Sequence, residues 1–149
     1  MSKHFKMMGF YFWLLGLFTI GRWAVSFSGM DYARATMIFS LVPLAVVASA
    51  HHAAFARVFA GYSWKDAATL GALIGVTTQI VIFVSTALSY GLGLSTLWND
   101  PVIGLNAKAA VPFADAMIAR VFGLVVNTIL NIVAASIGYG MGAFLKPVR

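Results

Sequence analysis

At 149 residues, 61% of them hydrophobic and 9% charged, the chain is too apolar for a soluble globular domain, in which about a quarter of residues are charged. Its four acidic residues are all aspartates, which leaves little for the paired-carboxylate chemistry of most hydrolases, and the absence of cysteine excludes disulfides, thiol nucleophiles and cysteine-ligated metals. The net charge of +6 is carried by single lysines and arginines between apolar runs, so we expect no nucleic-acid partner.

Four segments are long and apolar enough to be transmembrane helices, each of which needs about 20 residues to cross a hydrocarbon core ~30 Å thick. They run at about 7–27, 35–60, 67–93 and 117–145. We find no internal repeat and no linker between them. The sequence therefore predicts an all-α integral membrane protein, a single domain over residues 1–149 that forms a bundle of four transmembrane helices.

Arg22 interrupts the first segment, which can be either a transmembrane span or a signal peptide. An arginine near a helix end can snorkel to the lipid headgroups, so we expect the segment to remain a span. The alternative is a cleaved signal peptide, because Lys3 and Lys6 precede the apolar run and Ala24 to Ser26 has a small-x-small pattern. Arg22 inside that would-be cleavage region argues against the alternative.

The connectors predict the orientation of the bundle. Two are short, and the third, at about 94–115, contains Trp98, Pro101 and Pro112 and is the loop large enough to carry a functional surface. Six basic residues fall on the side of the termini and four on the other. By the positive-inside rule, both termini are predicted to be cytoplasmic and the protein to lie in a bacterial inner membrane.

Two stripes of small and polar residues mark where the third and fourth segments are expected to pack, because helices in lipid associate through close approach and hydrogen bonds. The glycines predicted to pack are Gly71, Gly75, Gly138 and Gly142. The amides Gln79, Asn127 and Asn131 accompany them. We favour hydrogen bonding across the helix interface for these amides, with a polar pathway through the membrane as the alternative.

His51 and His52 lie within the second segment, where an ionisable side chain indicates function unless it is structurally satisfied. Adjacent helical residues point about 100° apart, so the two share no face and form no metal chelate. His52 falls on a stripe of small residues that is expected to abut another helix. Hydrogen bonding to a neighbour is the favoured role, and haem or quinone binding and a proton or solute path are alternatives.

Several charged residues are expected near the membrane boundary on the side away from the termini. They suggest either a collar that binds an anion or separate side chains that snorkel to the lipid headgroups. They are Arg22, Arg34, Arg120, Asp31 and Asp115. Because they lie on different segments and nothing in the sequence forces them together, we favour snorkelling side chains.

No sequence motif specifies a reaction, so we predict the function only from the class of the protein, a small integral membrane protein. We expect a non-enzymatic subunit without a cofactor that packs in the lipid bilayer against copies of itself or other membrane subunits. One alternative is an oligomeric channel or transporter with a path through His51, His52 and the three amides. The other is a redox anchor that holds haem or quinone at the two histidines.

Overall fold

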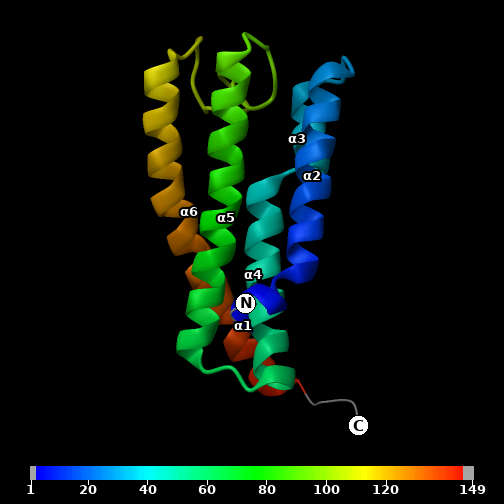
Figure 1. Cartoon of the computed structure of the whole chain (residues 1–149), viewed down its shortest axis with the longest axis vertical. Coiled ribbons are helices and arrows are strands. Elements are labelled where there is room, and N and C mark those ends of the chain that lie inside the picture. Colours follow the sequence, from blue (N-terminus) through cyan, green and yellow to red (C-terminus); the bar gives the residue numbers. More distant parts are fainter. Residues whose placement is uncertain (1–2, 146–149) are drawn as a thin grey trace.

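The computed structural model describes residues 3–145, and every regular element in that range is a helix. In chain order these are α1 (Lys3–Met7), α2 (Gly9–Phe27), α3 (Tyr32–Ile38), α4 (Leu41–Ala60), α5 (Trp64–Gly91), α6 (Phe113–Met141) and the short 3-10 helix η1 (Gly142–Phe144). They form an elongated bundle (Figure 1). Four candidate spans are long and apolar enough to cross a membrane, namely α2, α3 with α4, α5, and α6 with η1, and they indicate a membrane protein.

Local capping explains why the third and fourth spans begin earlier than their predicted starts at residues 67 and 117. Ser63 and Asp66 form a capping box in which each side chain bonds the other's backbone N–H, so α5 begins at Trp64. Pro112 precedes α6 and Gly93, with φ of +63°, follows the end of α5. The connecting segment is therefore 92–112, and not 94–115.

The second span is broken, although the sequence pattern predicted one continuous helix over 35–60. Phe39 and Ser40 leave the helical conformation between α3 and α4. The cause is Pro43, which has no N–H and whose ring clashes with the carbonyl four residues earlier, that of Phe39. The break leaves the N-terminus of α4 uncapped by the Ser40 side chain, within the length of the span.

The segment after α5 folds back into the bundle and is only partly a surface loop. We call residues 96–104 the plug, which Figure 1 shows descending beside α5. Leu97 and Trp98 are 0% and 1% exposed. The Thr96 hydroxyl lies 2.8 Å from that of Ser89, and the Thr86 hydroxyl donates to the Trp98 carbonyl at 3.3 Å. Burial of the indole and these internal hydrogen bonds explain why the segment does not extend into solvent.

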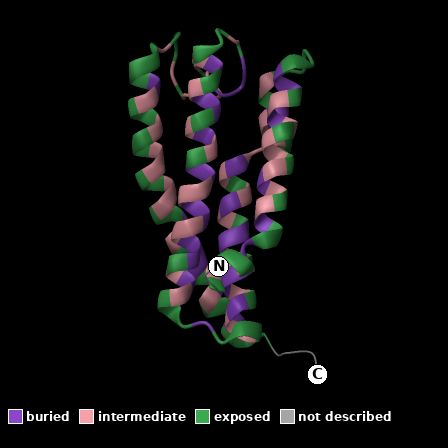
Figure 2. Ribbon diagram, in the orientation of Figure 1, coloured by how far each residue is buried: buried purple, intermediate pink, exposed green. Residues whose placement is uncertain are grey.

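Glycines on α5 allow α6 to approach closely. A Cβ atom on Gly71 would lie 2.5 Å from the carbonyl oxygen of Asn131, and one on Gly75 would lie 2.9 Å from the Cα of Thr128. Both distances are shorter than van der Waals contact, so the two backbones pack at a separation that a side chain would prevent. Buried positions accordingly concentrate on the inner faces of α4 and α5 (Figure 2).

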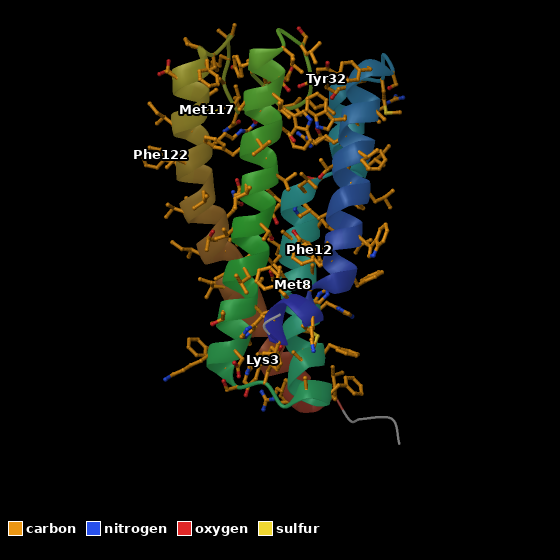
Figure 3. All side chains as sticks on the ribbon, in the orientation of Figure 1. Lys3, Met8, Phe12, Tyr32, Met117 and Phe122 are labelled. Carbon is orange, nitrogen blue, oxygen red and sulfur yellow. The ribbon has the colours of Figure 1, made fainter. Side chains whose placement is uncertain are left out.

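Glycines near the end of α6 face α4, and not α5 as the paired stripes had suggested. A Cβ on Gly138 would overlap the backbone of Ala50, and one on Gly142 would lie 2.9 Å from the carbonyl oxygen of Ala54. The stripe of small residues on α6 therefore packs against α5 over one part of the helix and against α4 nearer its C-terminal end. By contrast, the outer face of α6 exposes large apolar side chains such as Phe122, labelled in Figure 3, which is 68% exposed.

Both ends of the described chain lie at the end of the bundle that carries the α4–α5 turn (Figure 1). Lys3 of α1 forms an ion pair with Asp66 at the start of α5, and the His4 ring packs edge-on against Tyr62. The turn at 28–31 and the plug are at the opposite end. In that half, the close contacts of α3 are with α2, whereas α6 packs along α5. The plug occupies the space between these two helix pairs.

The contact at Gly138 makes a prediction about stability. We expect Gly138→Ala to lower the free energy of unfolding by about 1–3 kcal/mol, the usual cost of overpacking, because the added methyl meets the Ala50 backbone. Gly140→Ala on the same helix is the control, since its Cβ position is open and alanine favours helix. Thermal or denaturant unfolding of the purified protein in a mild detergent measures both. Equal stability of the two variants would contradict the prediction.

Candidate functional site

A cavity of about 160 Å³ lies between the two helix pairs, at the break in the second span and against the plug. It is lined by Arg22, Thr36, Ser40, Leu41, Val42, Ile82, Trp98, Ile103, Gly104 and Arg120. These residues come from all four spans and the plug. An engineered apolar cavity of similar size holds benzene, so this volume suffices for a ligand group of about six non-hydrogen atoms.

Arg22 enters the cavity from α2. Its two terminal nitrogens donate to the carbonyl oxygens of Phe39, at 3.4 Å, and Leu97, at 3.3 Å. The Phe39 carbonyl is the one that Pro43 leaves without a helical partner. The guanidinium also lies 4.8 Å from the centre of the Trp98 ring, in a cation–π contact. Arg22 is only 9% exposed, so the expectation that it snorkels to the headgroups is wrong, because these acceptors hold it inside the protein.

Arg120 approaches the plug from α6, on the other side. Its Nε donates to the Thr86 hydroxyl at 3.0 Å, and one terminal nitrogen donates to the Trp98 carbonyl at 2.7 Å. The two arginines therefore hold adjacent carbonyls of the plug from opposite helix pairs. Tertiary packing thus brings two of the five boundary charges, Arg22 and Arg120, to the lining of the same cavity.

The positive charges of this pair are not neutralised. No carboxylate of residues 3–145 lies within 4 Å of either guanidinium, and their acceptors are uncharged carbonyl and hydroxyl oxygens. A buried charge without a counter-ion costs several kcal/mol, and two like charges on one cavity add repulsion. The cavity is consequently electropositive.

Unused hydrogen-bond donors belong to residues that line the cavity, although these atoms expose almost no surface to it. The Nε of Arg22, the indole Nε1 of Trp98 and the hydroxyl of Thr36 are buried and have no partner among the described residues. The first two are donors only. Leu41 and Val42 form the first turn of α4, where backbone N–H groups lack helical partners and the helix dipole is positive. The two guanidinium groups and this first turn would together bind an anion with several acceptor oxygens.

The histidine pair lies away from this cavity, in the half of α4 nearer the termini. His52 is buried on the stripe with Ala45, Ala48 and Ser49, and its Nδ1 lies 2.8 Å from the Ala48 carbonyl. Because a carbonyl only accepts, Nδ1 carries the proton and Nε2 keeps its lone pair. His51 is exposed on another face, with ring planes 78° apart. Binding of haem or quinone by either ring stays a prediction.

The three amides lie at the interface of α5 and α6. Asn131 accepts from the Ser49 hydroxyl at 2.7 Å, and its amide nitrogen donates to the Asn127 carbonyl one turn earlier. Asn127 likewise donates to the Gly123 carbonyl. Gln79 is buried, with its oxygen 3.5 Å from where a Cβ on Gly123 would lie. The Ser49–Asn131 bond links α4 and α6, and both asparagines make hydrogen bonds nearby, while a pathway through the three amides stays a prediction.

Two signals in the sequence point to the cavity. Pro43 is far from the ends of the predicted second span, and a proline inside a helical pattern marks a break or a kink. Arg22 is an ionisable residue within the first span, which indicates a functional site by default. Trp98 and Thr36 carried no such signal, because only packing shows that their donors are buried and unpaired.

Comparison with known proteins gives no functional assignment to weigh against this geometry. No protein family, no curated protein and no solved structure matches the chain.

Proposed function

We propose that the protein is a non-enzymatic protein of the bacterial inner membrane that binds an anionic group in the cavity formed by Arg22, Arg120 and Trp98. The observation that carries the proposal is a pair of arginines on one cavity without a carboxylate partner, beside the N-terminus of α4. A bound anion would neutralise the charge of the two guanidinium groups and accept hydrogen bonds from them.

By the positive-inside rule we predict cytoplasmic termini, and with that orientation the cavity would lie in the outer half of the membrane. An anion at that depth would be held by groups fixed before it arrives, since the arginines are already positioned by the carbonyls of the plug and of Phe39. Such preorganisation reduces the entropy cost of binding.

The role as a subunit of a larger membrane complex or homo-oligomer stays a prediction. The outer face of α6 is apolar at Phe122, Val126 and Ile129, which suits contact with lipid as well as with another helix. Anion binding and assembly are compatible, because the cavity is lined by groups that face the interior of the bundle.

Replacing either cavity arginine should weaken binding of inorganic phosphate, the simplest probe. We expect Arg22→Gln and Arg120→Gln each to reduce affinity by about tenfold or more, because a charge-assisted hydrogen bond contributes about 1.5–3 kcal/mol. Arg34→Gln removes an equal charge from an exposed position on α3 at the same end of the bundle and should leave affinity unchanged. Isothermal titration calorimetry in a nonionic detergent makes the measurement. An equal effect of all three substitutions would show a general charge effect and contradict a specific site.

Because the arginines also hold the plug, a variant that spares these contacts is needed. Trp98→Phe keeps a buried aromatic ring and the backbone carbonyl that Arg120 binds, and it replaces the indole by a smaller ring without an N–H. We expect it to weaken phosphate binding by about two- to tenfold, because the smaller ring holds the Arg22 guanidinium less firmly in its cation–π contact. Trp13→Phe, at a position 80% exposed on α2, is the matched control. If Trp98→Phe folds normally and binds phosphate as the wild type does, the indole does not hold Arg22 for the ligand.

A further inference from the structure

An apolar groove on the outside of the bundle begins at the break in the second span. Its first part, of about 330 Å³, lies against Phe18 of α2 and the adjoining ends of α3 and α4. Ser40 lines both this groove and the arginine cavity. The break in the span therefore lies between a positively charged cavity and an apolar surface groove.

The groove continues along α4 toward the termini. A second part, of about 200 Å³, shares Leu44 and Val47 with the first and ends at His51 and His52. From Ser40 to His51 the helix rises by about 16 Å at 1.5 Å per residue. Half of a hydrocarbon core ~30 Å thick is a similar distance, so the groove has the length of one lipid chain in one leaflet.

We propose that the cavity and the groove together bind one lipid with a phosphate-monoester headgroup, the phosphate in the cavity and an acyl or isoprenoid chain in the groove. This inference rests on the proposed anion site and names the source of its anion. A phosphate monoester carries about −1.5 to −2 charge near neutral pH, which matches two guanidinium groups. Its three terminal oxygens suit the donors of residues that line the cavity, from Arg22, Arg120 and the first turn of α4.

The position of the plug favours a lipid over a free ion. Trp98, Ile103 and Gly104 line the cavity from the plug, which descends from the end of the bundle beside α5 (Figure 1). On another side, Ser40 lines both the cavity and the apolar groove. Because α3 packs on α2 and α6 packs on α5, the cavity lies between two helix pairs, and we infer that a headgroup enters between these pairs from the lipid.

The test compares three probes that differ by one feature each. They are a long-chain monoacylglycerol phosphate, glycerol phosphate, which lacks the chain, and the monoacylglycerol of the same chain, which lacks the phosphate. Binding to the full-length protein in nonionic detergent is measured by native mass spectrometry and calorimetry. We expect the monoacylglycerol phosphate to bind at least about tenfold more tightly than either of the other two.

Variants separate the groove from the cavity. Val47→Trp fills the groove at a position that is 67% exposed, and we expect it to weaken binding of the monoacylglycerol phosphate by about tenfold and leave glycerol phosphate unaffected. Val126→Trp, at a 61% exposed position on α6 outside the groove, should change neither. Arg22→Gln should weaken both phosphate probes.

Each result decides between the two proposals. If glycerol phosphate binds through Arg22 and the lipid binds no more tightly, or if Val47→Trp has no effect on the lipid, the lipid inference is overturned and the anion site stands. If neither phosphate probe binds the wild-type protein, the anion site fails and the lipid inference fails with it. Tight binding of the uncharged monoacylglycerol would show that the groove takes any apolar chain, which also overturns the inference.

Discussion

Pro43 cannot donate a backbone hydrogen bond, and its ring excludes the carbonyl of Phe39 from a regular helix. In an apolar surrounding each backbone polar group must find a partner within the protein, so a break inside a span has to be compensated. The guanidinium of Arg22 provides part of that compensation at the Phe39 carbonyl. The same break places the N-terminus of α4, whose first N–H groups lack helical partners, beside the cavity that Arg22 enters.

The two halves of the bundle use different means of packing. Toward the termini, α4, α5 and α6 approach closely at Gly71, Gly75 and Gly138, and the polar groups there bond within or between helices. Toward the other end, α2 with α3 and α5 with α6 form separate pairs. The plug fills the space between them, and Arg22 and Arg120 tie it to both pairs. A cavity forms there because a folded loop segment fills a wedge less completely than helices with small residues fill an interface.

A purely structural role for these arginines accounts for only part of the arrangement. Their bonds to carbonyl oxygens stabilise the plug, but carbonyls do not neutralise two positive charges, and the indole N–H of Trp98 would gain nothing from them. On the proposed function, a ligand that carries negative charge into the cavity would neutralise both guanidinium groups.

The sequence alone determined the class of the protein, because span length and apolar composition follow directly from the thickness of a membrane and are visible without any knowledge of packing. Helical periodicity likewise separated His52, on a small-residue stripe that is buried, from the exposed His51. Only the tertiary structure decided which distant residues meet. Gly138 contacts α4 and not α5, and Arg22 and Arg120 converge on Trp98, since these contacts depend on crossing geometry and on a loop that folds inward. The periodicity of apolar residues predicts which face of a helix is buried. It does not predict which other helix packs against that face, because that contact depends on residues far away in the sequence.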